Sequence, residues 1–258
     1  MKNAILTHLP GDFPWQVQYF DTIDSTNSYA RKLAADGAPH GTVVVAGQQT
    51  AGRGRMGRSF SSNRGAGVYL SVILRPSCRA TELMHLTCAV AVAACDAVQK
   101  VSDLRPQIKW INDLMSQGKK LGGILTEMSV DPATGYVNYA VIGIGINCKE
   151  QVFPADIKDI AIALEEVVKK PVCPNALTAA LLLSLQEMDG ALLTDKTRIM
   201  AKYKENCITL GQEIYLIRGD KRTPCRCLDL DENGSLLVEY PDGTAEFFNS
   251  GEVSVRPQ

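Results

Sequence analysis

Two runs of residues are so apolar that they constrain the fold more than any other feature of the chain. Residues 42–46 read TVVVA and residues 67–74 read GVYLSVIL, both rich in β-branched side chains and free of charge. Near-continuous apolar runs of this length are typical of strands buried within a sheet. The two runs therefore predict core strands.

The segment that joins these two predicted strands carries three arginines between glycines. Residues 49–60 read QTAGRGRMGRSF, which contains Arg53, Arg55 and Arg58. Glycine allows close approach to the backbone, and guanidinium groups bind carboxylates and phosphates through two parallel hydrogen bonds. The loop is therefore a candidate anion-binding site. Disordered nucleic-acid-binding segments share this composition, so the loop alone leaves that alternative open.

Composition narrows the class of protein. At 258 residues and 45% hydrophobic content, the chain can bury a large core and is expected to form one main domain and a small one. A net charge of -1 argues against non-specific nucleic-acid binding. We expect no apolar run long enough to cross a membrane, and Pro10 interrupts the N-terminus before a signal-peptide core develops. The expected location is the cytoplasm.

The remaining pattern up to residue 207 predicts a mixed sheet flanked by helices, an α+β fold. Residues 15–20 alternate like a strand, and residues 24–27 (DSTN) offer N-cap chemistry for a helix that Gly37 ends near residue 36. Residues 81–101 predict one long buried helix. Further strands are expected at 108–110, 114–128 with a turn at 116–119, and 137–146, and further helices at 159–169 and 175–205.

The pattern changes after Gly211 to short alternating strands. These are expected at residues 213–217, 225–229, 235–239 and 245–248, with glycine-containing turns between them. The chain is therefore divided into a domain at 1–207 and a small β-barrel at 208–258.

Eight cysteines raise the question of disulfides or metal. Cys88, Cys95 and Cys148 sit in apolar segments, so we interpret the cysteines as reduced core residues. Cys225 and Cys227 form a C-x-C pair, but no histidine lies near them in the sequence and structural zinc is not expected.

Three further polar segments are candidates for chemistry. Residues 109–113 (KWIND) place a cation, a stacking ring, an amide and a carboxylate at a strand end, although an ordinary strand-to-turn ending has the same residues. Residues 119–127 bring a lysine close to two glycines, where it can reach an anion. Residues 143–147 (GIGIN) are a weak signal by themselves.

Several enzyme classes lack their motifs here. The phosphate-binding loop with a Gly-Lys-Ser/Thr ending and the Gly-x-Ser-x-Gly elbow are absent from the sequence, and the dinucleotide fingerprint, a Gly-x-Gly-x-x-Gly followed by a strand and an acidic residue, is not found either. The sequence therefore supports neither a P-loop fold nor a dinucleotide-binding fold, and it does not indicate a hydrolase.

Five segments, in order, resemble the catalytic core of biotin protein ligases. They are residues 25–27 (STN), 49–58, 109–113, 120–125 (KLGGIL) and 143–147, and the likeness extends to residues 250–256. The resemblance implies a catalytic domain of the class II aminoacyl-tRNA synthetase-like fold, followed by a small SH3-like barrel. Only 24 residues precede Ser25, so the resemblance is to the monofunctional type that lacks the N-terminal DNA-binding domain.

Three positions depart from the family pattern. Ile111 stands where the family usually has proline, which we expect to alter the stiffness of the turn more than its chemistry. Phe60 stands where tryptophan is frequent, and Met56 where a basic residue is often found. The Phe60 exchange bears on how a ring of the substrate stacks.

The resemblance also implies a reaction. ATP adenylates the carboxylate of biotin with Mg²⁺ present, and the adenylate acylates a lysine of a biotin carboxyl carrier protein, either an acetyl-CoA carboxylase subunit or that of another biotin-dependent carboxylase. Lys120, Arg53 and Arg55 are implied to be catalytic. The implied biotin-binding residues are Ser25, Thr26, Gln49, Gly52, Arg53, Arg55, Lys120 and Gly123. The implied ATP-binding residues are Arg58, Phe60, Lys109, Asn112, Asn147 and Arg256, and Asp113 is the implied Mg²⁺ ligand.

Two other functions are carried as alternatives. A lipoate ligase or octanoyltransferase relative is the nearest enzyme, and a non-catalytic module that binds phosphate or RNA is the alternative from another class. We expect no DNA or membrane partner, and the sequence leaves open a homodimer that forms through an exposed sheet edge.

Overall fold

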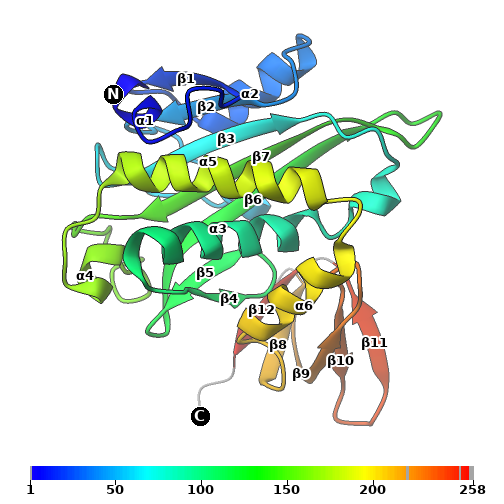
Figure 1. Ribbon diagram of the computed structural model, residues 1–258. Helices are drawn as coiled ribbons and strands as arrows, with labels where there is room; N and C mark the ends of the chain where they lie inside the picture. Colours follow the sequence, from blue (N-terminus) through cyan, green and yellow to red (C-terminus); the bar gives the residue numbers. More distant parts are fainter. Residues whose placement is uncertain (1, 219–220, 250, 256–258) are drawn as a thin grey trace.

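A seven-stranded mixed sheet organises the larger part of the protein (Figure 1). The computed structural model describes residues 2–218, 221–249 and 251–255. In spatial order the strands are β1-β2-β3-β7-β6-β5-β4; β1 and β2 run parallel and the other neighbours antiparallel. Their bounds are β1 (Gln16–Phe20), β2 (Thr42–Ala46), β3 (Gly67–Leu74), β4 (Gln107–Lys109), β5 (Asp113–Ser116), β6 (Lys119–Val130) and β7 (Val137–Asn147). The expected α+β class is confirmed.

Helix α2 (Thr26–Ala35) covers one face of this sheet. Ser25 is its N-cap, accepting a hydrogen bond from the Ser28 amide, and Gly37 follows its end with a φ of 90° that favours glycine. Ala30 and Ala34 pack on Val44 and neighbouring side chains of β3 and β7. The predicted strand-to-helix corner is confirmed at both ends of the helix.

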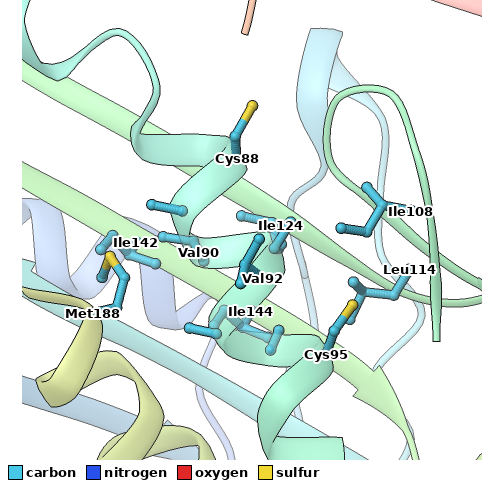
Figure 2. Packing of buried hydrophobic residues seen from close by; sticks show 14 of the residues in the cluster. Cys88, Val90, Val92, Cys95, Ile108, Leu114, Ile124, Ile142, Ile144 and Met188 are labelled. Atoms are coloured by element: carbon cyan, nitrogen blue, oxygen red, sulfur yellow. The ribbon is translucent and has the colours of Figure 1, made fainter. Parts of the chain in front are cut away.

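Helices α3 (Leu86–Ser102) and α5 (Pro174–Ala191) lie side by side on the opposite face (Figure 1). Figure 2 shows side chains of α3, among them Val90 and Val92, packed with Ile142 and Ile144 of β7. Successive side chains of a strand point to opposite faces of a sheet. Ile142 and Ile144 of β7 therefore face α3, and the residues between them face the opposite side of the sheet.

The stretch from Ala80 to Ser102 corrects two predictions. It is long and apolar enough to cross a membrane by length and composition alone, so the expectation that no run reaches this length is wrong. Most of it is buried inside the protein, as in a core helix. It is also not one continuous helix, since a 3-10 turn, η2 (Ala80–Leu83), precedes α3.

Two other predicted helices are shorter than expected. Only α4 (Leu164–Val168) forms within 159–169, because the Lys120 amide binds the Ile160 carbonyl at 2.7 Å and the Lys120 carbonyl accepts from the Ile162 amide, which holds the chain extended beside β6. The predicted helix at 175–205 is two, α5 and α6 (Lys196–Asn206), separated by a turn. A short N-terminal helix, α1 (Lys2–Leu6), was not predicted.

The C-terminal strands form a separate five-stranded antiparallel sheet, consistent with the expected small barrel. It contains β8 (Glu213–Arg218), β9 (Lys221–Leu230), β10 (Leu236–Glu239), β11 (Ala245–Phe248) and β12 (Glu252–Val255), the last of which was not predicted. Trp110 joins it to the main sheet: its indole Nε1 donates to the Gly234 carbonyl at 2.8 Å and its ring lies 6.0 Å from that of Phe248. The boundary at residue 207 stays a prediction.

All eight cysteines are free thiols, as expected. Seven are buried, including Cys225 and Cys227, but Cys173 is exposed and is therefore not a core residue. It precedes Pro174 at the start of α5, where the chain runs on the surface.

Candidate functional site

A cavity of about 430 Å³ brings together all five sequence segments that carry polar chemistry. It is lined by the N-terminus of α2, by residues 49–60 (the arginine loop), by the turn between β4 and β5, by strands β6 and β7, and by residues 153–161. Thirteen of the fifteen predicted site residues line it: Ser25, Thr26, Gln49, Arg53, Arg55, Arg58, Phe60, Lys109, Asn112, Asp113, Lys120, Gly123 and Asn147.

Two predicted residues are not among the lining. Gly52 is buried under the loop, and a side chain there would lie 2.9 Å from Ser62 Oγ and 3.0 Å from Gln49 Nε2. Gly52 therefore allows the loop to pack closely on itself. Arg256 lies outside the described residues.

The floor of the cavity is the face of the sheet that carries glycines. Gly143 and Gly145 alternate along β7 with Ile142 and Ile146, which belong to the hydrophobic core. The ring of Phe60 occupies the space that a side chain at position 145 would need, since a Cβ on Gly145 would lie 2.5 Å from the ring. Glycine is thus required where the loop packs down onto the sheet.

Phe60 is supported from behind by Tyr69 of β3. The two ring centroids are 6.4 Å apart with the planes at 67°, an edge-to-face arrangement. The Tyr69 hydroxyl donates to the Asn63 carbonyl, and burial raises the pKa of this phenol, so it stays neutral. The apolar end of the cavity wall is therefore fixed.

The arginine loop is a compact, hydrogen-bonded hairpin. The Phe60 amide donates to the Gly52 carbonyl at 2.8 Å and the Gly54 amide to the Arg58 carbonyl at 2.7 Å. Met56 and Gly57 turn the tip with positive φ values of 54° and 76°. The loop is therefore folded over the cavity and does not extend into solvent.

Arg53 and Arg55 each bind a different partner across the cavity. Arg53 forms a two-pronged ion pair with Glu127 of β6, with both N···O distances 3.0 Å. Arg55 donates to Asn112 Oδ1 at 3.1 Å and to the Gly251 carbonyl at 3.3 Å. Arg55 therefore ties the loop to the β4–β5 turn and to the C-terminal sheet.

Two lysines stand at the other side of the cavity. Lys120 Nζ lies 2.6 Å from Asp113 Oδ1, and Lys120 remains partly exposed, at 37% of its side chain. The side-chain ammonium of Lys109 makes no hydrogen bond or ion pair with any residue among those that the structure describes, although its backbone pairs with Asp113 in the sheet. A positive group is thus available for an anion beside the Lys120–Asp113 pair.

The N-terminus of α2 supplies neutral polar groups. Gln49 Oε1 accepts from the amide and the hydroxyl of Thr26, at 2.8 and 3.1 Å, and Gln49 Nε2 donates to Ser62 Oγ. Asn147, at the end of β7, donates through Nδ2 to the Ile162 carbonyl at 3.3 Å. These polar groups of the cavity wall are oriented before any ligand binds.

Sequence reasoning missed some lining and supporting residues. Glu127 was quoted only as the end of a segment, although strand alternation from Gly123 places it on the cavity face. Asn27 was quoted only as part of its motif. Phe153 and Ile157 belong to a segment for which the sequence predicted no helix or strand, and no local signal brings them to the cavity.

Comparison with known proteins gives one consistent result. The biotin/lipoate A/B protein ligase family matches residues 19–147, and the biotin protein ligase C-terminal domain matches residues 209–256. The bifunctional ligase/repressor BirA of Bacillus subtilis is 34% identical over 235 residues, covering 90% of this chain and 72% of that protein. The biotin–[acetyl-CoA-carboxylase] ligase of Mycobacterium tuberculosis is 27% identical, covering 89% and 85%.

Solved structures agree with these relatives. The biotin protein ligase of Aquifex aeolicus in complex with biotin and ATP has a TM-score of 0.78 and 28% identity, covering 94% of this chain and 99% of that one. The Leishmania major enzyme in complex with biotinyl-5-AMP has a TM-score of 0.64 at 25% identity, covering 91% and 99%.

Proposed function

The chain belongs to the biotin protein ligase family, and from that premise we propose how its cavity activates biotin and which residues take part. The protein is an ATP-dependent ligase that forms biotinyl-5'-AMP and transfers biotin to a carrier protein. The observation that carries the residue assignments is the cavity itself, where cationic, amide and glycine-lined surfaces from five segments meet.

The chemistry requires control of charge. An oxygen of the biotin carboxylate attacks the α-phosphorus of ATP, and the bond to pyrophosphate breaks. The amine of the acceptor lysine then attacks the carbonyl carbon of the mixed anhydride, and AMP leaves. Since the first step brings two anions together, cations aimed at the reacting oxygens lower its barrier.

Lys120 is the residue that we assign to both anions in the first step. Its ammonium group has three N–H donors, of which one is directed at Asp113. Two donors remain, one for the biotin carboxylate and one for the α-phosphate. Arg53 and Arg55 border the same space and stabilise the charge that develops on the phosphate and the leaving group.

Biotin is assigned to the end of the cavity near α2. Ser25, Thr26 and Gln49 offer the hydroxyl and amide groups that match the hydrogen-bonding atoms of the ureido ring. Gly123 leaves the backbone of β6 open to the ligand. Gly52 supports this end from beneath the loop.

ATP is assigned to the end near β4 and the C-terminal sheet. Arg58 and Lys109 face the polyphosphate, Phe60 offers a stacking surface, and Asn112 and Asn147 offer amide groups to the nucleotide. Arg256 stays a prediction for this site. The Gly251 carbonyl and Val253 line the same cavity, so the C-terminal sheet borders the site.

Asp113 fits Mg²⁺ only in part. Mg²⁺ is commonly held by one or two carboxylates together with substrate phosphates and water, so Asp113 can supply one ligand to an ion that ATP brings. Within the described residues no group of three carboxylate, histidine or cysteine side chains is placed to hold a metal by itself. Bound in this way, Mg²⁺ supplies charge neutralisation to the triphosphate.

The carrier is a biotin-accepting domain of a biotin-dependent carboxylase, and we propose the acetyl-CoA carboxylase subunit, as the name of the Mycobacterium tuberculosis relative suggests. A cytoplasmic location, a homodimer, and the absence of DNA and membrane partners stay predictions.

Exchange of labelled pyrophosphate into ATP tests these assignments. Wild-type protein should show exchange with biotin and little with lipoate, which discriminates against the lipoate alternative. Lys120→Ala should lose most of the biotin-dependent exchange, because the neighbouring ammonium group of Lys109 is assigned to the polyphosphate and not to the space between the two anions. Full exchange by this variant would remove Lys120 from its role, and no exchange by the wild type with either acid would favour a binding module.

A further inference from the structure

A buried chain of polar groups leads from the centre of the sheet to Arg53. Ser71 of β3 is fully buried, and its Oγ donates to Asn27 Oδ1 at 2.8 Å. Asn27 is 4% exposed, and its Nδ2 donates to Glu127 Oε2 at 2.8 Å. The carboxylate can only accept, so the Asn27 amide has a single favourable orientation between these two partners.

The side chain of Asn27 fits because β7 has a glycine below it. A Cβ at Gly143 would overlap Asn27 Oδ1. Ser71 also lies 2.9 Å from Thr26 Oγ1, which connects this chain to Gln49 at the start of the arginine loop. The polar chain is therefore packed on the floor of the cavity and is continuous with the first anchor of the loop.

Glu127 is the last member of the chain and meets a guanidinium fork. Arg53 Nη1 lies 3.0 Å from Oε2 and Nη2 lies 3.0 Å from Oε1, so both carboxylate oxygens are engaged. Arg31 approaches Oε1 at 3.7 Å from the more exposed side. Parallel two-pronged pairs fix the plane and the direction of a guanidinium group, not only its position.

We propose that Glu127 is a positioning residue for Arg53, and that Asn27 and Ser71 hold Glu127 in place. This inference rests on the function proposed above. Arg53 uses one N–H of each Nη atom on Glu127, which leaves its Nε–H and two further N–H groups for the biotin carboxylate and the phosphate. Glu127 acts through Arg53 and need not touch either substrate.

A double-mutant cycle tests this dependence. Glu127→Gln keeps the shape of the side chain but removes its charge, and we expect the efficiency of pyrophosphate exchange with biotin to fall about tenfold. In an Arg53→Ala background the same change should have almost no further effect, because residues that act as a unit are not additive. Glu127→Asp, which keeps the charge, should recover part of the loss.

The matched control is Glu187→Gln on the exposed surface of α5. It removes the same charge from an ion pair with Lys100 at 3.9 Å and should leave exchange at the wild-type level. Circular dichroism and urea unfolding of each variant separate a folding defect from the expected effect. The proposal also predicts faster tryptic cleavage after Arg53 in Glu127→Gln than in the wild type or in Glu187→Gln.

The outcomes are distinguishable. An equal loss from Glu127→Gln in the wild-type and Arg53→Ala backgrounds would overturn the positioning role, as would wild-type activity of Glu127→Gln. If the wild type showed no biotin-dependent exchange, the proposed function would fail instead. The tryptic cleavage rates would then decide the positioning role alone, and equal rates in the three proteins would overturn it.

Discussion

Gly145→Ala is the smallest change that should damage the cavity. Its Cβ would lie 2.5, 2.7 and 2.9 Å from three carbons of the Phe60 ring. Carbon atoms in contact normally lie about 3.5–4.0 Å apart, so the ring must move by about 1 Å. Overpacking of this kind costs about 1–3 kcal/mol of stability, and misplacing a binding group by about 1 Å can cost about 100-fold in activity.

Gly190→Ala is the matched control for this substitution. Gly190 is exposed on α5 with no atom within 4 Å of its ideal Cβ, so alanine there should stabilise the helix by about 0.5–1 kcal/mol. Urea unfolding gives the stability of each variant, and pyrophosphate exchange at varied ATP gives KM and kcat. We expect Gly145→Ala to lose stability and to raise the KM for ATP. Wild-type stability and KM would refute the packing of Phe60 on Gly145.

Three further predictions test other parts of the structure. Trp110→Phe removes the indole donor to the Gly234 carbonyl and should cost about 1–3 kcal/mol in urea unfolding; an unchanged midpoint would contradict the contact between the two sheets. Burial lowers the pKa of His85, so on acidification the unfolded chain takes up a proton at this residue before the folded protein does, starting near pH 6.5. The free energy of unfolding should therefore decrease as the pH is lowered from 7.5 to 5.5, and His85→Gln should make this decrease smaller. Iodoacetamide should modify Cys173 first, giving one adduct by mass spectrometry, because the other thiols are buried and burial raises the pKa of Cys95 and Cys148 to about 12; early modification of either would contradict their burial.

The sequence was most informative where one local signal decided the outcome. The apolar runs at 42–46 and 67–74 are strands with those bounds, and Ser25 and Gly37 flank α2 as predicted. In both cases the determinant is a side-chain pattern or a cap within the segment itself. Thirteen of the fifteen predicted site residues line one cavity for a related reason, since each motif lies at the end of such an element or on the strand face that borders the cavity.

Prediction failed where a distant partner decided the conformation. The chain leaves a turn at Ile160 and bridges to β6 at Ala161, because Lys120, about forty positions earlier, offers its backbone amide to the Ile160 carbonyl and its carbonyl to the Ile162 amide. The motif at 143–147 was a weak signal by itself. Its glycines lie within a strand, where they leave room for the side chains of Asn27 and Phe60 from other segments. No window of local sequence contains that information.

The pairing of Glu127 with Arg53 explains how the site keeps several cations close together before its two anionic substrates bind. Several unpaired cations held together in one cavity would repel one another and destabilise the fold. The protein instead places Glu127 beside Arg53 and Asp113 beside Lys120, each with N···O distances of 3.0 Å or less. Both pairs are partly exposed, so each is weak enough for a substrate carboxylate or phosphate to compete for the remaining donors. Because the cations are already oriented, substrate binding need not order them, and more of the binding energy remains for bringing the two anions together.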